Sequence, residues 1–146
     1  MEDNLNKRYQ TLLILWFALL MGIAMYFLFS LFVAPVSSNQ PGNPSRSLLI
    51  VALTALGTFL VVVSFPVKQR LLERAVEKQD TALVQKALVI ACAMCEVSAL
   101  LGLLEHLVIG NREYYLLFVM AAGGTAFHFP RRGQLEAASY KNPAQS

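Results

Sequence analysis

The segment LVQKALVIACAMCEVSALLGLLEHLVI, residues 83–109, decides the fold of this chain. It is longer than the ~20 mainly apolar residues that an α-helix needs to cross the ~30 Å hydrocarbon core of a bilayer. One carboxyl residue, Glu96, lies near its centre. A charge at the bilayer midplane costs ~2.5–3.5 kcal/mol on insertion scales, so Glu96 is a candidate functional residue.

Three further apolar segments accompany it, at residues 11–34, 48–65 and 114–129. Hydrophobic residues make up 56% of the 146 residues and charged residues 14%, against about 45–50% and about 25% in soluble domains. The sequence therefore predicts an all-α integral membrane protein. We expect a four-transmembrane-helix bundle that occupies residues 1–146 as a single membrane domain.

The connections between these segments have distinct compositions. The polar residues 1–10 are expected to be frayed or interfacial, and three prolines in residues 35–47 predict an exposed loop. We expect the second span to end at Pro66, followed by a charged amphipathic segment, residues 66–82, at the membrane surface. Gly110-Asn111 predicts a tight turn between the third and fourth spans.

Basic residues indicate the orientation, because Lys and Arg concentrate on the cytoplasmic side of membrane proteins. Only Arg46 and Arg112 lie in the other two connections. The N-terminal segment, the middle segment and the C-terminus hold Lys7, Arg8, Lys68, Arg70, Arg74, Lys78, Lys86, Arg131, Arg132 and Lys141. We therefore expect both termini and the amphipathic segment to be cytoplasmic, in a bacterial inner membrane. The partners expected are the lipid bilayer and other membrane proteins, not nucleic acid.

A rise of 1.5 Å per residue along each span predicts which residues lie at the depth of Glu96. Gly22 in the first span falls at its level, and the candidate hydrogen-bond partners are Thr54, Thr58 and Thr125. Lys and Arg are absent from that depth. Burial away from a cation favours the neutral carboxyl group, so we expect Glu96 to be a buried, protonated polar contact.

Small residues on the third span predict a helix-packing surface. Small side chains let helix backbones approach closely in lipid. The predicted packing residues are Ala91, Cys95, Ser98 and Gly102 on the third span, with Gly123 and Gly124 on the fourth.

The run ACAMCEVSALLGL, residues 91–103, resembles the carboxylate helix of the proton-translocating c subunits of rotary ATP synthases. In that family a mid-helix Glu or Asp is followed by a small residue and a Gly-Leu pair, as Glu96 is by Ala99 and Gly102-Leu103 here. The resemblance implies that Glu96 is a proton site. The chain is also similar to small bacterial four-span membrane proteins with a comparable third helix.

Three further motifs contain residue types that can take part in chemistry. Cys92 and Cys95 have C-x-x-C spacing, but they lie deep in an apolar helix and are interpreted as packing residues. Glu105 and His106 are interpreted as an interfacial pair facing the exposed side. His106 and His128 are possible cofactor ligands. No catalytic residue and no metal site is predicted, and the chain is not expected to be an enzyme.

The sequence thus leaves three functional hypotheses open. The first is a non-enzymatic membrane subunit that packs in a larger complex or a homo-oligomer, with Glu96 as a polar contact. The second is a proton-translocating or proton-linked component with Glu96 as the proton site. The third is a subunit that holds a haem or a pigment through His106 or His128; the first two require no cofactor.

Overall fold

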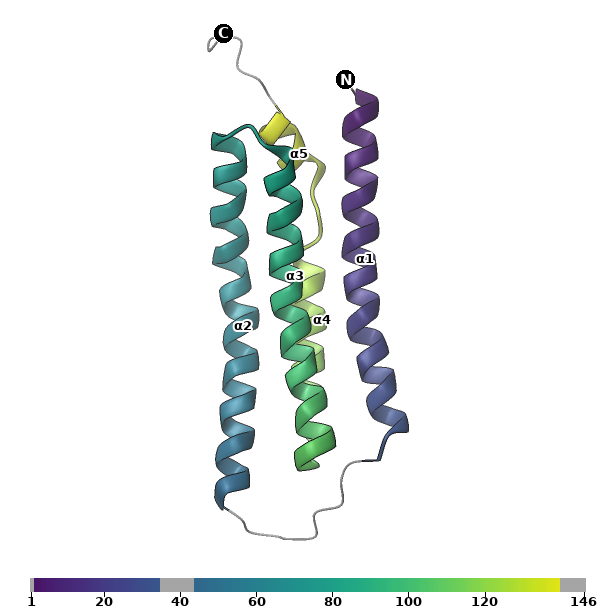
Figure 1. Ribbon diagram of the computed structural model, residues 1–146, viewed down its shortest axis with the longest axis vertical. Coiled ribbons are helices and arrows are strands. Elements are labelled where there is room, and N and C mark those ends of the chain that lie inside the picture. The colour runs from purple at the N-terminus through teal and green to yellow at the C-terminus, as the bar shows by residue number, and fades with distance from the viewer. Residues whose placement is uncertain (1, 35–43, 140–146) are drawn as a thin grey trace.

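A computed structural model describes residues 2–34 and 44–139, and every element in these ranges is helical (Figure 1). The helices are α1 (Glu2–Phe32), α2 (Pro44–Glu77), α3 (Thr81–Leu104), α4 (Tyr115–Phe127) and α5 (Arg132–Ser139). A π-helical turn, η1 (Glu105–Ile109), continues α3. The predicted all-α fold class is confirmed for this part of the chain.

Three of these helices are long and apolar enough to cross a membrane: Leu5–Phe32, Ser45–Glu77 and Thr81–Ile109. The helix α4 is apolar but has only 13 residues, which gives it a length of about 20 Å against a hydrocarbon core of ~30 Å. The chain is therefore a helical membrane protein by the length and composition of three helices, and its fourth apolar segment forms a shorter helix.

The helix α3 lies at the centre of the molecule. In Figure 1 it stands between α1 and α2, with α4 behind it, and it packs against all three. In its apolar stretch 44% of the residues are buried, against 11% in α1 and 17% in α2. The reason is its small residues, because Ala91, Cys95 and Ala99 let neighbouring helices approach it on several sides.

One predicted boundary is wrong. Pro66 does not end the second span but lies inside α2, which continues to Glu77. A proline in a helix removes one backbone hydrogen bond, and membrane helices tolerate this loss. Residues 66–77 are therefore not a separate segment lying on the membrane surface. Residues 2–10, expected to be frayed or interfacial, are helical and form the start of α1, so they are not frayed.

The two ends of the bundle differ in charge. The start of α1, the α2–α3 turn and α5 lie together at one end (Figure 1), which we call the basic end because it carries Arg8, Arg74, Lys78 and Arg132. The α3–α4 turn lies at the opposite end. There Gly110 adopts φ 68° as the C-cap of η1, a left-handed conformation that glycine adopts without steric cost. The predicted turn is confirmed.

Candidate intramembrane polar sites

Glu96 of α3 is directed toward Gly22 of α1. A Cβ atom at Gly22 would lie 2.9 Å from the Oε1 atom of Glu96, so the missing side chain makes room for the carboxyl group. Both residues are half-buried. Glu96 lies near the middle of the 29-residue Thr81–Ile109 stretch, and its carboxyl group therefore occupies the α1–α3 contact close to the expected bilayer midplane.

The three threonines expected as partners of Glu96 lie elsewhere. The Thr54 hydroxyl donates to Oε1 of Glu105 at 2.8 Å, and the Thr58 hydroxyl contacts the sulfur of Met120 at 3.8 Å. The buried Thr125 hydroxyl lies near the Cys95 thiol and makes no conventional hydrogen bond within the described chain. No hydrogen bond or ion pair joins Glu96 to any residue that the structure describes.

The small residues predicted for packing are buried in α3. Ala91, Cys95 and Ser98 are 0% exposed, and Gly102 is also buried. On α4 the two glycines differ. A Cβ atom at Gly124 would lie 3.0 Å from the Cys95 sulfur, whereas one at Gly123 would meet nothing within 4 Å. Gly124 therefore lies in the α3–α4 contact, and Gly123 faces open space.

A second polar group surrounds the end of α4 and joins it to α1 and α2. The Trp16 indole N–H donates to the Thr125 carbonyl at 2.7 Å, and the Lys68 ammonium donates to the His128 carbonyl at 2.9 Å. Lys68 is 8% exposed and His128 is 1% exposed. Carbonyl groups in the last turn of a helix lack their regular intrahelical partner. The Thr125 carbonyl accepts from the His128 N–H at 3.1 Å and has Trp16 as a second donor, whereas Lys68 is the donor to the His128 carbonyl. We call Trp16, Lys68 and His128 the α4 cap.

The side chain of His128 is held by Ser64 of α2. Its Nε2 atom lies 2.7 Å from the Ser64 hydroxyl, which in turn lies 2.6 Å from the Val61 carbonyl. The hydroxyl has one proton to donate, and Val61 can only accept it, so Nε2 of His128 is the donor toward Ser64. The Cys95 sulfur is 3.8 Å from the same hydroxyl. Cys95 therefore packs beside a polar group rather than in a wholly apolar core.

A third polar group occupies the opposite end of the molecule. Glu105, which is 1% exposed, accepts hydrogen bonds from Thr54 and from the Asn111 side chain, both at 2.8 Å. His106 donates from Nε2 to the Val33 carbonyl at 3.0 Å, and its ring stacks on Tyr114. Both residues are buried, so their interpretation as an exposed interfacial pair is wrong.

The π-helical turn η1 helps to explain how two consecutive residues are both buried. Successive side chains of a regular α-helix diverge by about 100°, and a π turn adds a residue to the turn that presents them. Glu105 contacts α2, whereas His106 contacts the end of α1. The π-helical turn thus allows the α3–α4 connection to contact both α1 and α2.

The two histidines expected as possible cofactor ligands belong to different polar groups, at opposite ends of α4. The Nε2 atom of each is engaged in a hydrogen bond within the protein. In the described ranges, no three His, Cys, Asp or Glu side chains lie close enough to hold a metal ion.

Several residues of these groups were not identified as site residues from the sequence. Trp16, Ser64 and Lys68 resemble ordinary interfacial or packing residues, because nothing in the local sequence shows that they meet the end of α4. Glu105 could have been predicted as a site residue from the sequence, since it is a carboxyl residue within an otherwise apolar helix. Its proximity to the expected membrane edge favoured the exposed interpretation.

No family model, curated protein or solved structure matches this chain. The length and composition of three helices place the chain in the class of helical membrane proteins.

Proposed function

We propose that this protein is a non-enzymatic integral membrane subunit that associates laterally, within the bilayer, with another membrane protein or with further copies of itself. The observation that carries the proposal is the half-buried carboxyl group of Glu96 in the α1–α3 contact, which has no hydrogen-bond partner in the described chain. A polar group in hydrocarbon is stabilised by a partner across a helix interface. A second chain would supply that partner.

The outer surface of the bundle supports lateral association. The helix α1 presents exposed apolar side chains along its length, including Phe17, Met21, Met25 and Phe29. Since few residues of its apolar stretch are buried, α1 has a broad face for lipid or for a neighbouring helix. Glu96 lies beside α1 and would face such a neighbour at the edge of the α1–α3 contact.

The proposal includes an orientation and a membrane. All four apolar segments cross the bilayer, with α4 completing its crossing through the residues that follow it. The basic end faces the cytoplasm and the α3–α4 turn faces the opposite side, in accord with the distribution of Lys and Arg. We assign the protein to the bacterial inner membrane on the same ground.

Substitutions at Glu96 test the proposed association. Glu96→Leu should reduce the assembled fraction of the protein in mild detergent, because it removes every hydrogen-bonding atom at that position. Glu96→Gln should retain assembly, because an amide can still donate and accept. The measurement is the mass distribution by native mass spectrometry or native electrophoresis. Glu73→Gln, at an exposed position of α2, is the control. Assembly of Glu96→Leu at the wild-type level would contradict the proposal.

A second candidate function is proton handling at Glu96. Its support is the position of the carboxyl group near the bilayer midplane and its accessibility at the edge of the helix contact, together with the resemblance of residues 91–103 to c subunits. A proton site requires a carboxyl group, so Glu96→Asp should retain proton-linked activity and Glu96→Gln should abolish it in an assembly that remains intact. An assembled Glu96→Gln protein with wild-type proton flux in liposomes would exclude this candidate.

A further inference from the structure

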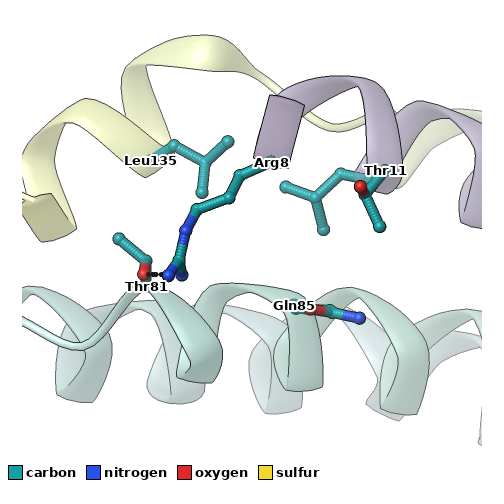
Figure 2. A pocket seen from close by; sticks show the side chains of 6 residues that line it. Arg8, Thr11, Thr81, Gln85 and Leu135 are labelled. Atoms are coloured by element: carbon teal, nitrogen blue, oxygen red, sulfur yellow. Dashed lines mark hydrogen bonds between the residues drawn. The ribbon is translucent and has the colours of Figure 1, made fainter. Parts of the chain in front are cut away.

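A cavity of about 280 Å³ opens at the basic end, where α1, α3 and α5 converge (Figure 2). Its lining residues are Arg8, Thr11 and Leu12 of α1, Thr81 and Gln85 of α3, and Leu135 of α5. Leu12 and Leu135 are buried. The polar side chains of α1 and α3 are at least 70 residues apart in the sequence, so the tertiary structure assembles the cavity.

The polar groups of this cavity are mainly hydrogen-bond donors suited to an oxyanion. Figure 2 shows the Arg8 side chain reaching from α1 across to α3, where it donates to the Thr81 hydroxyl. No carboxylate among the side chains that the structure describes, those of residues 5–34 and 45–139, pairs with Arg8, and none lines the cavity. Two hydroxyl groups and one amide complete the polar lining. The Thr11 hydroxyl already donates to the Lys7 carbonyl at 3.0 Å, so the donors open to a ligand are the Arg8 guanidinium group, the Thr81 hydroxyl and the Gln85 amide. Arginine with hydroxyl and amide donors is a donor set that binds phosphate oxygens.

The acidic residue beside Thr81 in the sequence, Asp80, does not pair with Arg8. The Asp80 carboxylate accepts a hydrogen bond from the Ala82 backbone at 2.8 Å and thereby caps the N-terminus of α3. Its cap also occupies one of the backbone N–H groups of α3. The cation available to a ligand in this cavity is therefore the Arg8 guanidinium group, not the end of the helix.

We propose that this cavity binds a phosphate group, and that the group belongs to the headgroup of an anionic phospholipid. The position of the cavity along the membrane normal supports a lipid as the source of the phosphate group. Thr81 is about 22 Å from Glu96 along α3, and Arg8 is about 21 Å from Gly22 along α1, at 1.5 Å of rise per residue. With Glu96 and Gly22 at the midplane, the cavity lies beyond the ~15 Å half-thickness of the hydrocarbon, in the headgroup region.

The charge of the cavity selects among phospholipids. Its guanidinium group, with which no carboxylate of residues 5–34 or 45–139 pairs, favours a headgroup with a net negative charge, such as phosphatidylglycerol. Phosphatidylcholine carries its own cation beside the phosphate, so it gains less from Arg8. Basic pockets at the cytoplasmic membrane surface bind anionic headgroups by this chemistry. The buried Leu12 and Leu135 add an apolar wall next to the polar lining.

The experiment measures lipid retention by the full-length protein in mild detergent, using native mass spectrometry. Wild-type protein, Arg8→Gln, Thr81→Val and Arg132→Gln are each incubated with phosphatidylglycerol or phosphatidylcholine. Arg132 is the matched control, because it is an exposed arginine at the same end that pairs with Glu136 at 2.9 Å. Wild type and Arg132→Gln should retain one phosphatidylglycerol molecule in preference to phosphatidylcholine, and Arg8→Gln should retain it about tenfold more weakly.

A competition with inorganic phosphate distinguishes the two sources of the phosphate group. Retention of phosphatidylglycerol against excess phosphate assigns the cavity to the lipid, whereas Arg8-dependent displacement by phosphate supports the phosphate site and reassigns its ligand to a soluble group. Thr81→Val removes one donor while keeping the side-chain shape, and it tests the cavity even where Arg8→Gln is poorly folded. The proposal is overturned if both variants retain phosphatidylglycerol as wild type does, or if wild type does not prefer it to phosphatidylcholine.

Discussion

At Gly22, the lack of a side chain determines where the Glu96 carboxyl group can lie. A single added Cβ atom would come within 2.9 Å of Oε1, closer than such atoms pack in proteins. The neighbour is the end of a flexible side chain, so a substitution displaces the carboxyl group before it separates the two helices. The contact between Gly22 and Glu96 therefore couples the packing of α1 to the position of an ionisable group.

This coupling predicts the outcome of a double-mutant cycle. Gly22→Ala should lower the melting temperature in detergent when Glu96 is present and have little effect when Glu96 is replaced by alanine, because the clash is then absent. The expected coupling free energy is ~0.5–3 kcal/mol, as for residues in contact. Gly123→Ala is the control, since a Cβ atom there meets no neighbour within 4 Å. Additive effects of Gly22→Ala and Glu96→Ala would show that the two residues do not interact.

At the scale of single elements, α4 is notable for ending inside the bundle. An unsatisfied backbone group is costly in an apolar environment. The Thr125 carbonyl already accepts from the His128 N–H, whereas the His128 carbonyl accepts from Lys68. The α4 cap provides two donors from two other helices, Trp16 of α1 and Lys68 of α2. The Lys68 ammonium group also places a positive charge at the negative end of the α4 dipole. A short, interrupted fourth helix is thereby accommodated.

Removing either donor should destabilise the protein. Lys68→Met keeps the length and apolar stem of the side chain but leaves the His128 carbonyl unpaired, at an expected cost of ~1–3 kcal/mol. Trp16→Phe removes the indole donor while preserving an aromatic contact with Phe129, whose ring lies 5.1 Å from that of Trp16. Both variants should lower the thermal unfolding temperature in detergent. Arg70→Met, at an exposed position of α2, should leave it unchanged; an equal loss in all three would argue against the cap.

At the scale of the whole molecule, the proposed orientation predicts which end is accessible from outside the cell. Cysteines introduced as Glu77→Cys at the basic end and Glu113→Cys at the opposite end occupy exposed positions. The native Cys92 and Cys95 are 0% exposed and should contribute little background. A membrane-impermeant maleimide should label Glu113→Cys in cells with a permeabilised outer membrane, and Glu77→Cys only after the inner membrane is opened. Labelling in the reverse order would invert the orientation.

The helices were predictable because hydropathy and helix breakers are local properties of a sequence. Residues 83–109 and 114–129 correspond closely to the observed helices, and the turn at Gly110 lies where it was predicted. The end of the second span was misplaced for an equally local reason. Pro66 indicates a boundary in a soluble helix, whereas α2 continues through it and packs its Lys68 and Ala75 side chains into the molecule.

The contacts of the polar groups were less predictable. Depth matching placed Gly22 level with Glu96, and the two residues do meet. The same argument also predicted Thr54 as a hydrogen-bond partner of Glu96, but the Thr54 hydroxyl donates to Glu105 instead. Depth fixes only the position along the membrane normal, whereas a hydrogen bond also requires that two side chains face each other around their helix axes.

The sequence by itself determined the helical class, the apolar helices and the presence of a carboxyl residue at mid-helix, since these depend on the order of residues within one segment. Only the tertiary structure decided which groups meet: Glu96 with Gly22, Glu105 with Thr54 and Asn111, and Arg8 with Thr81. The physical reason is that each pair depends on the rotation and the close packing of helices that are distant in the chain. Those quantities are set by the shapes of all the helices together.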